Sequence, residues 1–550
     1  MSARSLKAGI AVLALVCSAF VIAACGDDSG GGGGGEGKTG GTIKIVGNAF
    51  PDFLDPALSY TQEGWSALIH VYPGLVTFPH KSGPEGSEPA PALAEALPEV
   101  SADGRTYKLR LRENLQFSDG KPIQASDFKA SIERVLETDS QGVGLGFTNI
   151  VGAEEFLKTK KGGITGIEVD DQTRDITINL VEPRGPFTFE LAIPFAEVVP
   201  KDTPGRNQTQ NPPPGAGRYM FEDVETGRSY RMVKNPNFSP GLEGTAVDAG
   251  KADGFTFSEE TASASVTMIS QNQADFAIDN PAPDRIAEIK SQYSDRYREL
   301  PSTSTFYFFI NSEQEPFDDV RVRRAVNHAI DPDAINRVQG GVISAASATL
   351  PSSVPGYKKT PDLYPHDVAK AKALIKEAGV EGESVTVWGN PENPTKPTVE
   401  YYADVLNDIG LDAKVRIVSS ETYFTTIGDR ETGAQTGWAN WFQDYPHPAN
   451  FIDVLLNPKR VVATGNNNYS YNAADKELQR KIDAASEKQL SPEVEEEWAA
   501  IDQEIQEKAY WGIYGTRKQA TFMSERMDFE NCAGDNYAPT VHDWAQFCLK

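Results

Sequence analysis

The chain has 550 residues, which is too long for a single hydrophobic core and predicts three or four domains. Its formal net charge is −26. Residues 1–24 carry Arg4, Lys7 and no acid, so the chain without them has a net charge of −28. Nucleic acids and anionic lipids bind basic patches, so this acidic balance argues against both as partners. The hydrophobic content of 39% is that of a globular protein rather than a disordered one.

The N-terminus has the pattern of a secretion signal. Arg4 and Lys7 precede an uncharged run, 8–24, that is rich in Ala, Val and Leu and is followed by Gly26 and two acids. Such a run is short for a membrane-spanning helix and is typical of a signal-peptide core. It ends in Val-Ile-Ala-Ala before Cys25, which resembles the bacterial lipobox. We expect residues 1–24 to be a lipoprotein signal peptide and Cys25 to carry the lipid; a plain signal peptide with an incidental cysteine is the alternative.

A flexible tether is predicted to follow the lipidated cysteine, over residues 25–40. Residues 29–35 include six glycines in seven positions, and glycine-rich chains behave as flexible coils with no packing role. The rest of the chain would then hang from a lipid anchor on the outer face of the cytoplasmic membrane, in the extracytoplasmic space.

Cys532 and Cys548 remain once Cys17 and Cys25 are assigned to the N-terminal signal. In an exported chain these two favour a disulfide that closes a loop of 17 residues, with two free thiols as the alternative. The chain has six histidines, and no two of them have metal-ligand spacing. We therefore predict neither a metal site nor a cofactor.

In chain order, the first half reads as strands mixed with helices. After a strand at 42–46, Tyr107, Leu109 and Leu111 alternate with basic residues, as a half-buried strand requires, and Ser126 is expected to cap a helix at 127–137. The further predicted elements are strands 164–169 and 175–181, the hairpin 217–224 and 229–235, strand 254–257, helix 261–271 and strand 275–278. The strand, helix, strand order indicates an α/β fold. Runs rich in proline at 79–91 and 203–214 mark crossings between domains.

The second half repeats the α/β rhythm from an aromatic strand at 304–311 onward. The predicted elements are helices 320–330 and 367–378, strand 384–388, helix 398–409, strand 413–418, a short helix at 421–429, helices 474–487 and 492–508, and strand 510–522. Gly379 and Gly410 stand where helices end, and Ser491 before Pro492 is a good helix start.

The most distinctive stretch is an aromatic strand at 437–448. Two Trp, one Phe and one Tyr occur within eight residues, 438–445, with Asp444 as the single acid. A buried carboxylate without a partner is costly or becomes neutral, and a cation on a ligand could be that partner. Strand alternation places Phe442 and Asp444 on one face and Trp441 and Gln443 on the other. The alternative is a core strand whose Asp caps the following turn.

Motifs of catalysis are missing from the sequence. It has no Gly-x-Ser-x-Gly elbow, no His-Glu-x-x-His motif and no catalytic Cys, so we do not expect an enzyme. A surface hydrolase is the least favoured alternative.

Eight segments, in order, resemble the bacterial extracellular solute-binding proteins of family 5, which serve ABC importers of dipeptides and oligopeptides. The segments are LDPA (54–57), VYPGLV (71–76), PALAE (91–95), SADGRTY (101–107), FSDGKPI (117–123), NPNF (235–238), VRVRRA (320–325) with AID (329–331), and residues 441–451. Together they span most of residues 41–525.

The resemblance implies a periplasmic-binding-protein-like α/β fold of two lobes, a Venus flytrap, with an extra inserted domain. Lobe I would consist of residues 41–80, 203–303 and 509–550, the inserted domain II of residues 81–202, and lobe III of residues 304–508. The ligand would be enclosed between the lobes by hinge closure.

The resemblance also implies the ligand contacts. Asp444 would pair with the α-ammonium group of a peptide held as an added extended strand. The other expected ligand contacts are Asn440, Trp441, Phe442, Tyr60, Thr61, Gln62, Tyr423 and Arg430. Tyr423 would be an aromatic wall, and Arg430 is the candidate for the ligand carboxylate, with a solvated helix-end arginine as the alternative.

The predicted function is that of a substrate-binding lipoprotein of an ABC transporter. It would capture extracellular dipeptides or oligopeptides between two lobes and deliver them to a membrane permease. The alternative is the same fold with another solute, such as a metal chelate, an oligosaccharide or an antibiotic. The expected partners are a small peptide and the permease, with no nucleic acid, and we expect a monomer.

Overall fold

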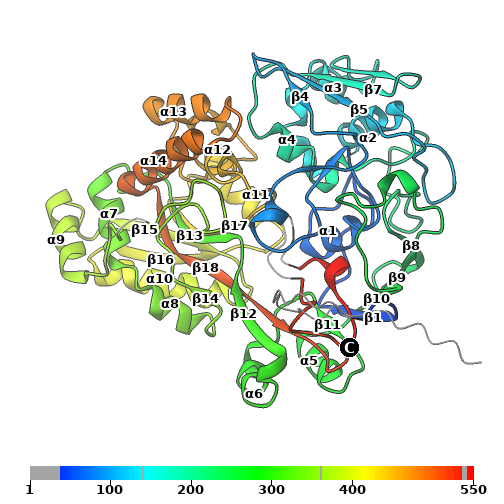
Figure 1. Ribbon diagram of the computed structural model, residues 1–550. Helices are drawn as coiled ribbons and strands as arrows, with labels where there is room; N and C mark the ends of the chain where they lie inside the picture. Colours follow the sequence, from blue (N-terminus) through cyan, green and yellow to red (C-terminus); the bar gives the residue numbers. More distant parts are fainter. Residues whose placement is uncertain (1–37, 139, 360–361, 535–539, 541) are drawn as a thin grey trace, which may run out of the picture. The chain divides into compact units, whose positions relative to one another are not determined.

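The computed structural model describes residues 38–138, 140–359, 362–534, 540 and 542–550. The predicted signal peptide, Cys25 and the predicted tether up to residue 37 lie outside the described residues. Within these ranges the strands form sheets of five, four and seven strands and a small pair of β2 (Val76–Thr77) and β3 (Ala90–Pro91) (Figure 1). In the same ranges, no helix has both the length and the apolar character that crossing a bilayer requires.

The first sheet has five strands in the order β11-β1-β10-β9-β8. They are β1 (Thr42–Gly47), β8 (Tyr219–Glu225), β9 (Ser229–Lys234), β10 (Gly254–Glu259) and β11 (Phe276–Ala277). β1 is parallel to both of its neighbours, and α5 (Ala262–Ser270) connects β10 to β11. This is the strand, helix, strand order predicted for residues 254–278. The chain leaves β1 toward α1 (Gln62–Leu68), and the loop between them contributes to the site described below.

The second sheet has four antiparallel strands in the order β4-β5-β7-β6. They are β4 (Glu99–Val100), β5 (Thr106–Arg110), β6 (Ile167–Asp170) and β7 (Asp175–Asn179), accompanied by α2 (Ala125–Glu137) and α3 (Ala153–Thr159). Tyr107 and Leu109 are buried while Lys108 and Arg110 are exposed, as the alternation predicts. The sheet lies within the segment 81–202, yet its core residues belong to the same hydrophobic cluster as Ile43 of β1.

The start of α2 differs from the prediction. Ser126 is not the cap but lies inside the helix, where its hydroxyl donates to Asp171 Oδ2 at 2.9 Å. The carboxylate of Asp127 instead accepts from the backbone N–H of Gln124 at 2.7 Å. Asp127, in the first turn, thus accepts from a backbone N–H group at the start of the helix. The sequence predicted Ser126, its neighbour, as the capping residue.

The third sheet has seven strands in the order β12-β18-β13-β17-β15-β16, with β14 also paired to β18. The strands are β12 (Tyr297–Pro301), β13 (Ser304–Ile310), β14 (Ile343–Ser344), β15 (Ser384–Gly389), β16 (Asp412–Ile417), β17 (Thr436–Phe442) and β18 (Trp511–Phe522). The principal helices of this region are α7 (Val320–Ala329), α8 (Pro332–Val338), α9 (Val368–Ala378), α10 (Thr395–Asp408), α11 (Tyr423–Ile427), α12 (Ile452–Leu456), α13 (Lys476–Ser486) and α14 (Pro492–Lys508) (Figure 1). Gly379 ends α9 with a positive φ of 77°, and Ser491 caps α14, as predicted.

Helices on both faces of β13 explain the unbroken apolar run at residues 306–310. Phe306 and Phe308 belong to a hydrophobic cluster with residues of α7, α9 and α10. Tyr307 and Phe309 belong to another cluster, which contains Trp498 of α14. Because helices cover both faces of the strand, the side chains of residues 306–310 are apolar on both faces. All seven residues of β13 are buried.

The predicted domain limits at 303 and 509 do not coincide with the sheet pairing. β12 and β18 fall in segments expected in lobe I, but they pair within the seven-stranded sheet. β18 pairs with β13 over Trp511–Gly515 and with β12 over Lys518–Phe522. Periodicity shows that a segment is extended but not which sheet it joins. Met523 then bridges to Phe276 of β11, where the chain returns to the first sheet.

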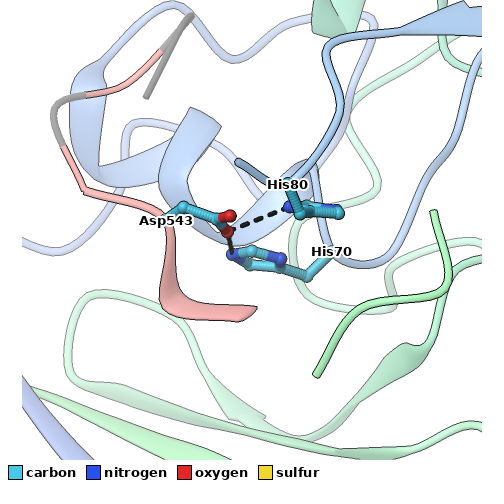
Figure 2. A group of neighbouring side chains, drawn as sticks. All are labelled: His70, His80 and Asp543. Carbon is cyan, nitrogen blue, oxygen red and sulfur yellow. Dashed lines mark hydrogen bonds and ion pairs between the residues drawn. The ribbon is translucent and has the colours of Figure 1, made fainter. Parts of the chain in front are cut away.

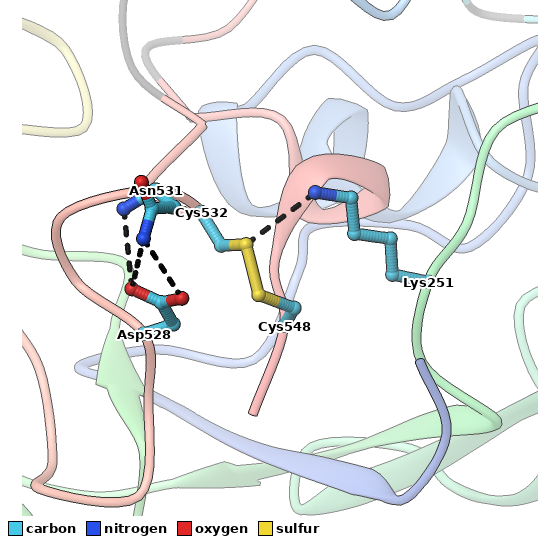
Figure 3. Close-up of a disulfide and its surroundings, with 5 residues drawn as sticks. All are labelled: Lys251, Asp528, Asn531, Cys532 and Cys548. Atoms are coloured by element: carbon cyan, nitrogen blue, oxygen red, sulfur yellow. Dashed lines mark hydrogen bonds between the residues drawn. A yellow bond between two sulfur atoms is a disulfide. The ribbon is translucent and has the colours of Figure 1, made fainter. Parts of the chain in front are cut away.

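A disulfide closes the C-terminal segment (Figure 3). It joins Cys532 to Cys548, the pairing that the sequence favours, and both cysteines are buried. The ammonium group of Lys251 donates to Cys532 Sγ at 3.4 Å, from the loop before β10. This contact places the C-terminal segment against the first sheet.

Candidate functional site

The aromatic strand β17 ends at the candidate site. It pairs with β13 along its whole length but with β15 only at Thr436 and Gly437. The backbone N–H of Gln443 still donates to the carbonyl of Thr303 at 2.9 Å, and the chain then turns at Asp444. Pro446 and Pro448 follow, and proline has no N–H to continue a ladder. Beyond Gly437, no strand of the described residues pairs with the second edge of β17.

The carboxylate of Asp444 is buried, with 5% of the residue exposed, and among the described residues only neutral groups donate to it. The hydroxyl of Tyr60 donates to Oδ1 at 2.8 Å, and the amide of Asn450 donates to Oδ2 at 2.7 Å. In return, Asn450 Oδ1 accepts from the backbone N–H of Asp444 at 2.9 Å. Burial raises the pKa of Asp444 to about 6, and the hydrogen bonds from Asn450 and Tyr60 act in the opposite direction.

No arginine, lysine or histidine in the described part of the chain pairs with Asp444. A carboxylate offers about four acceptor positions, and Tyr60 and Asn450 use two of them. About two acceptor positions of the carboxylate therefore remain for a cationic donor. An ammonium group would also offset the burial of this charge, which the neutral donors do only in part.

Tyr60 reaches Asp444 from a loop that Asp52 organises. The Asp52 carboxylate accepts from the backbone N–H of Tyr60 at 2.7 Å and from the hydroxyls of Ser59 and Thr61 at 2.8 and 2.9 Å. The ring of Tyr60 packs against Trp65. Burial, and to a smaller extent the charge of Asp444, raises the pKa of the Tyr60 hydroxyl well above its ordinary value. The hydroxyl therefore keeps its proton and donates it in the hydrogen bond.

Thr61 and Gln62, predicted to border the ligand, lie at the start of α1. The hydroxyl of Thr61 donates to Asp52 and accepts from the backbone N–H of Gly64 at 3.3 Å, so it is the helix cap. Gln62 is the first residue of the helix and is partly buried. Of the three predicted residues in this segment, the structure brings only Tyr60 into contact with Asp444.

Trp441, rather than Phe442, shares a partner with Asp444. The indole N–H of Trp441 donates to Asn450 Oδ1 at 3.3 Å, the atom that also accepts from the Asp444 backbone. β17 ends at Phe442, so the strand alternation used to predict a shared face for Phe442 and Asp444 does not extend to Asp444. Phe442 is 39% exposed and packs edge to face on Phe306, and Asn440 lies opposite Phe306 in the ladder.

Tyr423 and Arg430 do not have the surroundings expected of ligand contacts. Tyr423 is completely buried, and its hydroxyl bonds to the carbonyls of Trp388 and Trp438 at 3.1 and 2.6 Å. The neighbouring Phe424 is 40% exposed, because one residue along a helix rotates a side chain by about 100°. Arg430 forms a bidentate ion pair with Glu313, with both contacts at 2.8 Å.

A second buried network, which the sequence analysis missed, begins at Tyr445. The hydroxyl of Tyr445 donates to Glu190 Oε1 at 3.1 Å. Arg184 pairs with the same carboxylate at 2.5 Å and lies 3.7 Å from Asp453, which also pairs with Arg460 at 2.5 Å. These acids have arginine partners, unlike Asp444.

The sequence has no local signal for the contact between Tyr445 and Glu190, because the two residues are more than 250 positions apart. Asn450, in contrast, lies only six residues after Asp444.

Two hollows lie near these elements. One, of about 430 Å³, is lined by Ser304 and Thr305 of β13, by residues 344–348 and 350–352, and by Lys358 and Lys359. The other, of about 850 Å³, is lined by Arg184, Asp453 and other charged residues of the segments 105–184 and 453–487. Asp444, covered by Tyr60, lines neither hollow.

Comparisons with known proteins agree with this architecture. The family model of bacterial extracellular solute-binding proteins, family 5 Middle, matches residues 88–461. The dipeptide-binding protein of Escherichia coli (strain K12) is 27% identical over 445 residues, covering 76% of this chain and 78% of the relative. Heme-binding protein A of Haemophilus influenzae is 26% identical over 489 residues, covering 83% and 85%.

A solved structure shares the fold. Clavulanic acid biosynthesis oligopeptide binding protein 2 superposes with a TM-score of 0.82 at 22% identity, covering 93% of this chain and 96% of that one. The predicted fold class is thereby confirmed. Because the family model covers more than half of the sequence, the chain belongs to the bacterial extracellular solute-binding proteins of family 5.

Proposed function

We propose that the chain is the substrate-binding lipoprotein of an ABC importer and that it captures peptides by their free α-ammonium group. Asp444 is the anchor. The observation that carries the proposal is its buried carboxylate, which accepts hydrogen bonds from Tyr60 and Asn450 and has no cationic partner among the described residues. A binding role rather than catalysis is in keeping with the family.

The open edge of β17 supports a peptide as the ligand. Residues 438–442 pair with β13 on one side, while no described strand pairs with the other side. An extended peptide could add there as a strand, taking its affinity from backbone hydrogen bonds rather than from particular side chains. The name of the Escherichia coli relative, a dipeptide-binding protein, is consistent with this class of ligand.

Recognition of the ligand carboxylate is not assigned to Arg430, because Glu313 already occupies its guanidinium group. Affinity would then depend mainly on the ammonium end and the backbone of the peptide. Capture would involve relative movement of the first and third sheets about the two chain crossings, the segment 278–296 and Met523. Cys25 would carry the lipid that keeps the protein beside its permease.

The test is thermal unfolding of the full chain, purified in detergent, with peptides that differ only at the N-terminus. With a free tripeptide at 100 times its Kd, binding should add about 2.7 kcal/mol to the free energy of unfolding. Acetylation of the peptide removes the cation and should abolish the increase, and Asp444→Asn should abolish it with the free peptide.

Asp502→Asn is the matched control. Asp502 is also buried, its pKa is also raised to about 6 by burial, and it accepts from the backbone of Thr349 at 3.1 Å. This variant should retain the response to free peptide. Equal stabilisation by free and acetylated peptides would contradict the ammonium anchor, and no response to any peptide would contradict the peptide assignment.

A flat aromatic solute such as heme is the second candidate. Phe442 and Phe424 are exposed aromatic residues of this region, and one relative is named a heme-binding protein. Stacking on such rings needs no carboxylate. Heme bound by the chain would show a shifted absorption band that Phe442→Ala weakens and Asp444→Asn leaves unchanged, the reverse of the pattern expected for peptides.

A further inference from the structure

The side chains of two histidines and an aspartate that do not belong to the Asp444 site lie close together (Figure 2). His70 lies just after α1, His80 follows β2, and Asp543 caps the short 3₁₀ helix η11 (Trp544–Gln546). Their side chains are 1%, 4% and 0% exposed. His80 Nδ1 lies 2.9 Å from Asp543 Oδ1, and His70 Nε2 lies 3.8 Å from the same oxygen.

His70 is a buried imidazole whose nitrogens are both without a hydrogen-bond partner. A neutral imidazole carries a proton on one nitrogen and a lone pair on the other, and the lone pair can bind a metal. The 3.8 Å from Nε2 to Asp543 is too long for a hydrogen bond. Buried polar atoms without partners are rare in folded proteins, and Figure 2 shows Nε2 directed at the Asp543 carboxylate.

We propose that His70, His80 and Asp543 bind a zinc ion. Each residue offers one ligand atom, and the three atoms lie within 4.8 Å of one another. In a tetrahedral zinc site with bonds of about 2.1 Å, ligand atoms are about 3.4 Å apart. The two separations from Asp543 Oδ1, 2.9 Å to His80 Nδ1 and 3.8 Å to His70 Nε2, lie on either side of this value and within about half an ångström of it.

The donor set favours zinc over the common hard cations. Two imidazoles and one carboxylate suit zinc, whereas calcium and magnesium prefer oxygen ligands only. Asp543 is held in place by its neighbours, since Oδ1 accepts from the backbone N–H of Ala545 at 3.1 Å and Oδ2 accepts from the amide of Gln546 at 3.0 Å. Such supporting contacts orient a ligating group before the metal arrives.

The ion would have a structural role. It would tie the segment that ends in Cys548 to two positions near the start of the chain, beside the first sheet. His70 also packs against Phe255 of β10 and Trp544 of η11, so the site lies at the seam between these elements. Histidine spacing could not reveal it, because the histidines are ten positions apart and the third ligand follows 463 positions after His80.

The test is the zinc content of the full chain, purified in detergent, incubated with excess zinc chloride and desalted. Wild type should retain about one zinc per chain by mass spectrometry, and zinc at 100 times its Kd should lower the unfolding equilibrium constant about 100-fold. His70→Phe and Asp543→Asn should retain none and show no stabilisation by zinc. The phenylalanine keeps a ring in the aromatic stack, and the asparagine can still cap η11, so both variants are expected to fold.

His366→Ala is the control for adventitious binding, because His366 is exposed and outside the cluster. Its zinc content should equal that of wild type. Near-ultraviolet circular dichroism checks that the variants are folded without zinc. The proposal is overturned if wild type retains no zinc, or if folded His70→Phe retains as much as wild type does. Neither outcome touches the peptide assignment, which is tested without metal.

Discussion

Two buried aspartates, Asp55 and Asp444, meet opposite surroundings in the same protein. Asp55 forms two hydrogen bonds of 2.6 Å with the guanidinium group of Arg134, and the backbone N–H groups of Ala57 and Gln208 donate to it as well. Asp444 has a tyrosine hydroxyl and an amide but no cation. Both carboxylates are 5% exposed or less.

The difference separates a structural carboxylate from one that is suited to a ligand. At Asp55 the protein supplies the positive charge, so the pair is complete within the fold. At Asp444 the positive charge is left to something outside the described chain. Burial and a missing cation are not sufficient by themselves, because Asp502 is also buried with neutral donors. What distinguishes Asp444 is that it follows the end of β17, whose second edge is open beyond Gly437 among the described strands.

The largest effect should come from making Asp55 resemble Asp444. Arg134→Leu removes the cation and leaves a buried carboxylate with backbone donors only, which should cost about 3–5 kcal/mol of folding free energy. Denaturant unfolding followed by tryptophan fluorescence measures the loss. Arg110→Gln is the control, because it breaks the exposed pair with Asp175 and should change stability far less. A loss for Arg134→Leu no larger than the control would mean that the ion pair does not matter for folding.

A smaller effect is expected when the pH is lowered, because peptide affinity should decrease. The ammonium group needs the ionised form of Asp444, whose pKa is about 6 without ligand, so affinity should fall about 10-fold between pH 7 and pH 5. For the ligand-free chain the sign is opposite: the raised pKa favours the folded state below pH 4, and this contribution is lost as the pH rises through 6. Calorimetric titration measures the affinity. A pH-independent affinity would exclude Asp444 as the anchor.

The smallest effect should come from Tyr60→Phe, which deletes one neutral donor. A hydrogen bond to a charged group worth about 1.4 kcal/mol holds the pKa of Asp444 down by about one unit, so the pKa should rise to about 7. Peptide affinity should then fall about two-fold at pH 7 and scarcely at pH 8. The same titration at both pH values measures this. A loss of equal size at the two pH values would indicate that the hydroxyl contacts the ligand directly.

The sequence predicted the elements whose signals are local. The alternation around Tyr107, the Ser491 cap and the glycine after α9 are decided by neighbouring residues, and the structure has all three. The aromatic strand also follows from local composition. Asn450, only six residues after Asp444, was not among the predicted site residues, although its position is local.

The rest depends on contacts that the sequence does not encode locally. Tyr60 lies 384 positions from Asp444 and was found only through the family resemblance. The ion pair of Arg430 with Glu313, 117 positions away, likewise has no local signal in the sequence. Tyr423 shows a different limit: whether it or Phe424 is exposed depends on the rotation of one short helix, which packing rather than propensity determines.

The place of β18 also bears on how the protein is made. β18 lies between β12 and β13, which do not pair with each other, so the aromatic edge of β13 has no neighbour on that side until residues 511–522 have emerged. An open, apolar strand edge readily pairs with other chains. More than nine-tenths of the chain must therefore be synthesised before this edge is covered, and protection from aggregation until then has to come from chaperones or from delayed folding.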